Sequence, residues 1–172
     1  MSKRLFAVLA TLMVVSMMLT ACGAAEYECT DALGCVSYGP GEPVRLASAL
    51  VISGPNTDLG VDSQNGVEIA MAFKGEVAGH ALELQAEDDG CSAEGGQAAG
   101  QKIVSDPTII GIVGTSCSGA GVPLSQVMSD AGYVMVSPSN TSPALTNPDS
   151  AWNPGYYRTA HNDKVQGKAM AD

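Results

Sequence analysis

Two kinds of residue pattern alternate along the chain from residue 44 to its end. Short apolar or alternating runs bounded by turn residues predict four β-strands, at residues 44–53, 81–86, 108–113 and 133–136. Helical spacing predicts four helices, at residues 62–74, 92–105, 122–131 and from about Asn162 onward. Parallel strands need crossover helices, so this order predicts an α/β fold in which a parallel sheet is flanked by helices in three layers.

Four predicted loops follow the strands at the edge where open parallel sheets bind ligands: 53–60, 87–91, 114–121 and 137–147. The loop at 114–121 places Ser118 at a helix start. Backbone N–H groups are unpaired there and the helix dipole is positive, so these groups and the hydroxyl could hold a carboxylate. The alternative is that Ser116 or Ser118 only caps the helix.

The loop at 137–147 presents Ser139, Asn140 and Thr141 after a strand that ends in Ser137-Pro138. Such a turn exposes backbone carbonyls that suit an ammonium group and a threonine hydroxyl that suits a carboxylate. The alternative is a polar loop that binds nothing. Together with the loop at 114–121, this turn predicts half of a binding cleft for a small zwitterion.

The sequence argues against an enzyme. The acidic residues 87–89 are adjacent, so their carboxylates point in different directions and are expected to solvate a loop. A serine nucleophile elbow needs glycine two places before and two places after the serine, and Ser116 has Gly114 before it but Ser118 after it. We therefore expect no catalytic residue and no cofactor.

The first 21 residues predict a lipoprotein signal peptide. Lys3 and Arg4 precede a 15-residue apolar run at 5–19, which is short for a membrane span, and the run closes on Leu-Thr-Ala-Cys. This ending is similar to a bacterial lipobox, which implies cleavage before Cys22 and acylation of that residue. An ordinary signal peptide is the alternative. Acyl chains would anchor the protein on the outer side of a membrane without spanning it.

The net charge and the positions of cysteine and histidine argue against nucleic acid and against a metal ion as partners. Removal of residues 1–21 takes the Lys and Arg count from 8 to 6 and leaves all 18 Asp and Glu, so the formal charge becomes about −12. Such a surface repels nucleic acid, which binds clustered Lys and Arg. The chain has no CxxC, and both histidines, His80 and His161, lie far from any cysteine in sequence, which argues against a metal site.

The five cysteines fit an exported protein. If Cys22 carries the lipid, four cysteines remain and can pair in three ways. Two of them bracket a short polar loop and two follow different predicted strands. From these positions we predict the pairs Cys29–Cys35 and Cys91–Cys117.

The order and spacing of several motifs across residues 44–172 resemble one family: Ser53-Gly54-Pro55, Asn65 to Ala70, Asp88 to Cys91, Gly114 to Ser118, Val136 to Pro143 with Leu145-Thr146, and Tyr157 to Ala160 with Asp163, Gln166 and Gly167. The chain resembles the branched-chain amino-acid binding proteins of ABC uptake systems, in the periplasmic binding protein type I family. The resemblance implies two α/β lobes joined by a hinge and a disulfide between Cys91 and Cys117.

The same resemblance assigns roles to the two turns. It implies that Ser118 and Thr141 hold the ligand carboxylate, and that the backbone at Ser139 together with Thr141 receives the ammonium group. Leu59 matches a loop position that is often aromatic in the family and packs on the ligand side chain. The leucine leaves the side-chain preference open.

We therefore expect residues 1–21 to be a signal peptide, residues 22–43 a lipid-anchored tether with a small disulfide loop, and residues 44–172 an incomplete first lobe from a truncated reading frame. The expected function is capture of a branched-chain amino acid or related amide and its delivery to the permease of an ABC importer. A ligand-sensing ectodomain of a signalling receptor is the alternative. One lobe cannot exclude water from charge pairs, so we expect the 172-residue product to bind amino acids weakly or not at all.

Overall fold

The computed structural model describes residues 27–31 and 34–172. The predicted signal peptide at 1–21 and the predicted lipid site Cys22 lie outside these residues. Within the described part of the chain, no helix is both long and apolar enough to cross a membrane.

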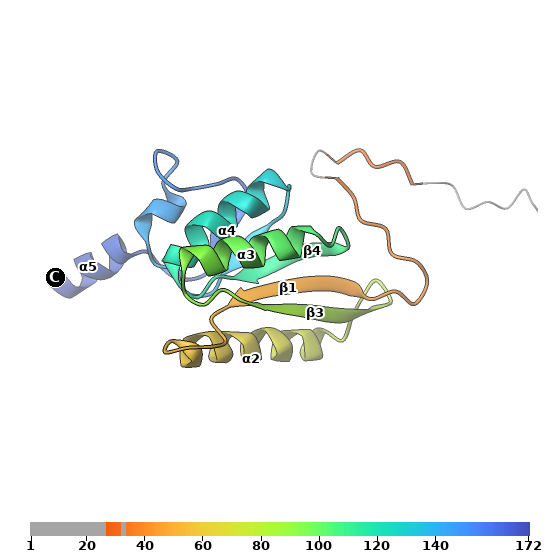
Figure 1. Ribbon diagram of the computed structural model, residues 1–172, viewed down its shortest axis with the longest axis horizontal. Helices are drawn as coiled ribbons and strands as arrows, with labels where there is room; N and C mark the ends of the chain where they lie inside the picture. The colour runs from red at the N-terminus through yellow and green to blue at the C-terminus, as the bar shows by residue number, and fades with distance from the viewer. Residues whose placement is uncertain (1–26, 32–33) are drawn as a thin grey trace, which may run out of the picture. The chain divides into compact units, whose positions relative to one another are not determined.

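Six strands of the described chain form one sheet in the order β2-β3-β1-β4-β5-β6 (Figure 1). Their bounds are β1 Val44–Leu50, β2 Glu76–Val77, β3 His80–Asp88, β4 Ile109–Gly114, β5 Met135–Ser137 and β6 Tyr156–Arg158. Neighbouring strands are parallel except for β2 and β3, which form an antiparallel hairpin at one edge. The chain lays β3 on one side of β1 and then continues with β4 on the other, so the direction of winding reverses at β1.

Helices cover both faces of this sheet (Figure 1). The helices are α2 Thr57–Lys74, α3 Ala93–Val104, α4 Ser118–Asp130 and α5 Asp163–Ala171, with a 3-10 turn η1 at Pro143–Thr146. Helix α2 lies on one face of the sheet, and α3 and α4 pack together on the other. Opposite faces are expected, because right-handed crossovers that run in opposite directions along a sheet leave it on opposite sides. The mostly parallel, helix-flanked α/β architecture predicted from the sequence is confirmed.

The main hydrophobic core lies between the sheet and the pair α3 and α4. Its largest fully buried side chains come from both helices, from strands β4 and β5 and from η1: Ile103, Ile109, Leu124, Met128, Met135 and Leu145. The residues of α2 that are buried are Gly60 and Gln64, so this helix contributes little to the core. The well-packed half of the lobe is therefore the half that carries α4 and the loops at its two ends.

Some predicted boundaries were wrong. Helix α2 begins at Thr57, five residues before the predicted start at residue 62. Its N-cap residue, Asn56, makes no capping hydrogen bond through its side chain. The short strands β2 and β6 were not predicted, because neither carries an apolar run of its own.

The close approach of α2 to the end of β1 gives a test of the fold. A methyl group added at Gly60 would lie 1.9 Å from the carbonyl oxygen of Val51, whereas one added at Gly66 would meet no atom within 4 Å. We expect Gly60→Ala to lower the free energy of unfolding by about 2–3 kcal/mol, because backbone must move. Gly66→Ala in the same helix should raise it by about 0.5–1 kcal/mol. Urea unfolding of both variants measures the difference, and equal stabilities would contradict this contact.

Part of the predicted tether lies against the amino ends of the strands. The Tyr38 hydroxyl donates to the carbonyl oxygen of Thr108 at 2.6 Å. The Tyr38 ring lies 5.9 Å from the ring of His80, whose Nδ1 is 2.7 Å from the carbonyl oxygen of Glu42. The chain therefore enters the lobe at the amino ends of the strands, and the loops that follow the strands lie at the opposite end of the sheet.

Candidate functional site

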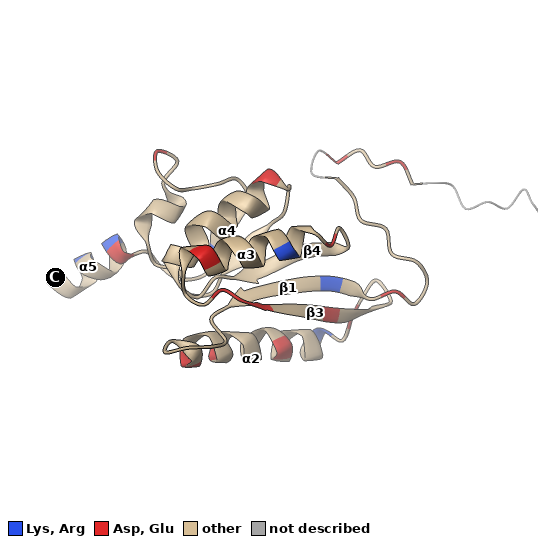
Figure 2. Cartoon of the chain, in the orientation of Figure 1, with Lys and Arg blue, Asp and Glu red and all other residues tan. Residues whose placement is uncertain are grey.

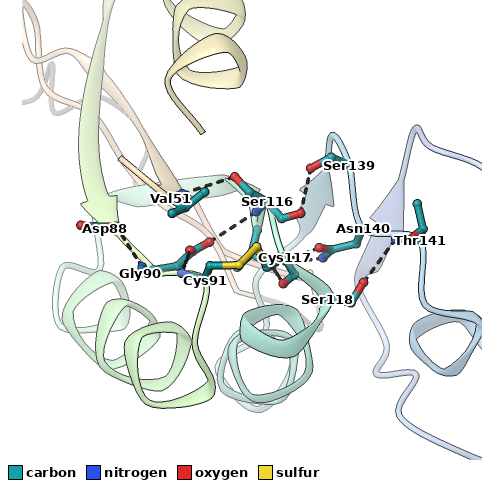
Figure 3. Close-up of a disulfide and its surroundings, with 12 residues drawn as sticks. Val51, Asp88, Gly90, Cys91, Ser116, Cys117, Ser118, Ser139, Asn140 and Thr141 are labelled. Carbon is teal, nitrogen blue, oxygen red and sulfur yellow. Dashed lines mark hydrogen bonds between the residues drawn. A yellow bond between two sulfur atoms is a disulfide. The ribbon is translucent and has the colours of Figure 1, made fainter. Parts of the chain in front are cut away.

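The loops after β1, β4 and β5 emerge side by side at one edge of the sheet. Ser48 of β1 pairs with Val113 of β4, and Val113 pairs with Val136 of β5, in parallel register. The carboxyl ends of these three strands therefore meet next to the point where the winding reverses, which is where open α/β sheets bind their ligands. Figure 3 shows the residues that gather there.

Ser118 is the first residue of α4 and joins the two predicted turns. Its Oγ accepts a hydrogen bond from the backbone N–H group of Thr141 at 3.2 Å (Figure 3) and another from that of Ser142 at 3.1 Å. A hydroxyl that accepts two bonds still has its own proton to donate. Within the described residues, the backbone N–H groups of Ser118 and Gly119 also have no acceptor. Three donors at the positive end of α4 are thus available to an anion.

The capping interpretation of these serines is wrong. The N-cap residue of α4 is Cys117, and no side chain caps this helix. The Ser116 hydroxyl instead accepts the backbone N–H of Val51 at 3.3 Å and so ties the loop after β4 to the end of β1.

All four backbone N–H groups of the turn at 139–142 donate to serine hydroxyls. The first two donate to Ser137 Oγ, at 3.3 and 2.9 Å, and the last two donate to Ser118. Ser137 Oγ in turn donates to the carbonyl oxygen of Thr115 at 2.8 Å. This turn therefore has no backbone donor left for a ligand.

Three of the four carbonyl groups of the same turn also have partners. The second and fourth accept from the guanidinium of Arg158, at 3.2 and 2.8 Å, and the third accepts from the backbone N–H of Asp163 at 2.9 Å. Among the described residues, no group donates to the carbonyl oxygen of Ser139, and the Thr141 hydroxyl has no partner. The turn therefore offers a ligand one backbone acceptor and one hydroxyl.

A buried amide fixes the turn from below. Asn140 is fully buried, and its side-chain amide meets the Thr115 hydroxyl, with Nδ2 at 3.1 Å and Oδ1 at 3.3 Å. Helix α4 passes so close that a methyl group added at Gly121 would lie 2.5 Å from Asn140 Nδ2. From its sequence neighbourhood Asn140 is predicted only as a turn residue, because its partner lies 25 positions away.

A disulfide links the loop after β3 to the start of α4. Cys91 and Cys117 form this bond, with their Cα atoms 5.1 Å apart (Figure 3). This is one of the two predicted pairs. Cys29 and Cys35 are disulfide-bonded as well, and their pairing with each other stays a prediction.

Two adjacent carboxylates hold these loops together. Asp89 is fully buried and accepts the backbone N–H groups of Cys91 at 2.7 Å and Ser116 at 3.3 Å. Burial raises the pKa of Asp89, and these two donors only partly offset the rise. Partial burial also acts to raise the pKa of Asp88, but its hydrogen bonds, led by the Ser53 hydroxyl, outweigh this and lower it. Both side chains are committed to loop structure.

Leu59 lies in the first turn of α2 and not in a loop, and 46% of its surface is exposed. It lines a mostly apolar groove of about 800 Å³ between α2 and the sheet, and Pro138 and Ser139 line the same groove. The structure thus brings Leu59 to the same groove as Ser139, while Ser118 and Thr141 are joined directly by a hydrogen bond.

Charged side chains form no metal-binding cluster in the part of the chain that the structure describes. No group of three His, Cys, Asp or Glu residues there could hold a metal ion. His80 lies at the opposite end of the sheet, beside Glu42. Acidic side chains are spread over α2, β3 and α3, and Lys and Arg are few and scattered among them (Figure 2).

Comparison with known proteins shows which family the chain belongs to. Residues 43–172 match a family model described as periplasmic binding protein. The chain is 32% identical over 108 residues to the Leu/Ile/Val-binding protein of Escherichia coli (strain K12), covering 61% of this chain and 29% of that protein. It is 32% identical over 133 residues to the leucine-specific-binding protein of Salmonella typhimurium, covering 76% and 35%.

A solved structure agrees with these matches. An ABC transporter substrate-binding protein from Desulfitobacterium hafniense, in complex with Leu, is 26% identical and superposes with a TM-score of 0.65 over 76% of this chain and 38% of that chain. The chain thus spans about a third of the length of these relatives. These relatives are named as binding proteins. Because the family model matches most of the chain, this protein belongs to the periplasmic binding protein family.

Proposed function

We propose that this lobe provides half of an amino-acid binding site in an extracytoplasmic solute-binding lipoprotein that serves an ABC importer. One observation carries the proposal. After the hydrogen bonds among the described residues of both turns are assigned, the groups left over include three donors at Ser118 and Gly119, the Thr141 hydroxyl and the Ser139 carbonyl. The donors suit a carboxylate and the carbonyl suits an ammonium group, and an amino acid carries both on one carbon.

In this proposal the Ser118 and Thr141 hydroxyls bind the ligand carboxylate, and the Ser139 carbonyl together with the Thr141 hydroxyl receives the ammonium group. A hydrogen bond to a charged group contributes about 1.5–3 kcal/mol. Because Ser118, Ser139 and Thr141 are only half-buried in this lobe, further protein has to cover the ligand to reach the full value.

Leu59 is proposed to contact the ligand side chain. It is exposed, and it lines one groove with Pro138 and Ser139, next to the proposed ammonium site. An aliphatic contact favours an apolar side chain. The relatives are named for leucine, isoleucine and valine. We therefore propose a branched-chain amino acid or a related amide as the ligand.

The tether geometry supports delivery from a membrane anchor. We propose that residues 1–21 are removed, that Cys22 is acylated, and that residues 22–43 connect the anchor to the lobe. Tyr38 and Glu42 hold the last part of this tether against the amino ends of the strands. The binding edge lies at the opposite end of the sheet and would stay open to solutes and to the importer permease.

A thermal-shift screen tests the proposed ligand class. Binding is measured on the longest natural chain that carries this lobe, called here the full-length protein. We expect leucine or a similar amino acid to raise the melting temperature, as linkage requires. Isoamylamine, which lacks the carboxylate of leucine, and 4-methylpentanoate, which lacks the ammonium group, should give little or no shift. Equal shifts with all three compounds would contradict a clamp for both charged groups.

A further inference from the structure

Arg158, the last residue of β6, is bound to the proposed ligand turn at several points. Its NH1 group donates to the carbonyl oxygens of Asn140 at 3.2 Å and Ser142 at 2.8 Å, and its NH2 group donates to the Thr146 hydroxyl at 2.5 Å. The guanidinium is planar and its donors are fixed in a fork, so it can hold several acceptors in one geometry. No acidic residue in the described chain forms an ion pair with it.

The residues that follow Arg158 continue along the same turn. The Thr159 N–H donates to the carbonyl oxygen of Ser137 at 3.0 Å, and the Thr159 hydroxyl donates to that of Pro138 at 3.3 Å. The Asp163 N–H then donates to the carbonyl oxygen of Thr141 at 2.9 Å. Helix α5, which begins there, has no buried residue and extends away from the rest of the lobe (Figure 1). The segment at 158–163 is therefore bonded to residues 137–142 at both of its ends.

We infer that Arg158 is a positioning residue for the amino-acid site, an inference that rests on the proposed function. By occupying the carbonyl groups of Asn140 and Ser142, Arg158 leaves the Ser139 carbonyl as the acceptor that the turn can offer to an ammonium group. It also joins the turn to the segment at 158–163. Without the guanidinium, two more carbonyls become free, and the bond from the Asp163 N–H to the Thr141 carbonyl is left as the link between the turn at 139–142 and that segment.

The test compares three variants of the full-length protein by calorimetry with leucine. Arg158→Ala should weaken leucine binding about 10-fold, and soluble guanidinium at a non-denaturing concentration should restore part of the affinity. Arg158→Lys should recover little, because an ammonium group lacks the fork of donors. Arg45→Ala is the control. Arg45 binds Glu83 and Asp106 near the amino ends of the strands, so this variant should lose stability without any rescue of affinity by guanidinium.

Amide hydrogen exchange gives a second readout that does not depend on a ligand. Arg158→Ala should speed exchange at the N–H groups of Thr141 and Ser142, whose acceptor is Ser118, and Arg45→Ala should not. If wild type binds no amino acid, the proposed function fails, but faster exchange would still support the positioning role. Unchanged exchange in Arg158→Ala, or leucine affinity equal to that of wild type, would overturn the inference.

Discussion

Replacing Ser118 with alanine in the full-length protein is expected to weaken leucine binding about 100-fold, or about 2.7 kcal/mol. The variant loses the hydroxyl donor proposed for the ligand carboxylate. It also leaves the backbone N–H groups of Thr141 and Ser142 without their acceptor, which loosens the turn that carries the ammonium site. Isothermal titration calorimetry measures both the affinity and the enthalpy lost.

A serine on the same helix provides the control for this variant. Ser125 is buried in α4, donates to the carbonyl oxygen of Val122 at 3.0 Å, and accepts from Asn153 Nδ2 at 3.0 Å. Ser125→Ala should lower the melting temperature and leave leucine affinity within about twofold, because it touches neither turn. If Ser118→Ala binds leucine as tightly as the control variant does, Ser118 is not part of the binding site.

Removing the disulfide between Cys91 and Cys117 should lower the free energy of unfolding by about 3.5 kcal/mol. The bond closes a loop with a sequence separation of 26 residues, and the loop-entropy relation gives this value at 25 °C. The expected fall in melting temperature is on the order of 10 °C. Urea unfolding of the double variant Cys91→Ala, Cys117→Ala measures the effect on the mature chain.

The buried carboxylate of Asp89 should hold the folded loops in place when the disulfide is removed. It ties the same two loops through the N–H groups of Cys91 and Ser116, and these bonds survive in the double variant. The loops should therefore keep their places in the folded state, and the stability loss should come from the freed unfolded chain. A loss below about 1 kcal/mol would mean that the disulfide adds little beyond these bonds.

Strands β4 and β5 could be predicted from the sequence because each is a short apolar run between turn residues. Helix α3 was predicted for a similar reason, since Ser92 caps it and accepts the N–H of Gly95 at 3.0 Å. Helix α4 was predicted in the correct order, but it begins at Ser118, four residues before the predicted start. These signals are local. They depend on residues close together in the sequence, so they can be recognised without knowledge of the fold.

The start of α2 and the strand β6 could not be predicted, because long-range contacts decide both. Gly60 suggested a loop, but the structure needs a glycine there because the helix passes against the Val51 carbonyl. Strand β6 has only three residues, and it exists because Met135, Val136 and Ser137 offer a parallel partner. Neither the contact between Gly60 and Val51 nor the unpaired edge of β5 can be inferred from the residues near them in the sequence.

The candidate site was predicted in part. Ser118, Ser139 and Thr141 follow from loops that end parallel strands, and their gathering at one edge follows from strand order. Ser137 and Arg158, which fix the turn, were missed as supporting residues. Arg158 meets Asn140 across 18 positions, and nothing in its own neighbourhood indicates that pairing.

The central claim is that Ser118, Thr141 and the Ser139 carbonyl form half of a clamp for an amino acid. A crystal structure of the full-length protein grown with leucine tests it most directly. We predict the leucine carboxylate within hydrogen-bond distance of Ser118 Oγ and Thr141 Oγ1, and the ammonium group within that distance of the Ser139 carbonyl oxygen. Leucine bound elsewhere, or bound at this edge with its charged groups away from these atoms, would contradict the claim.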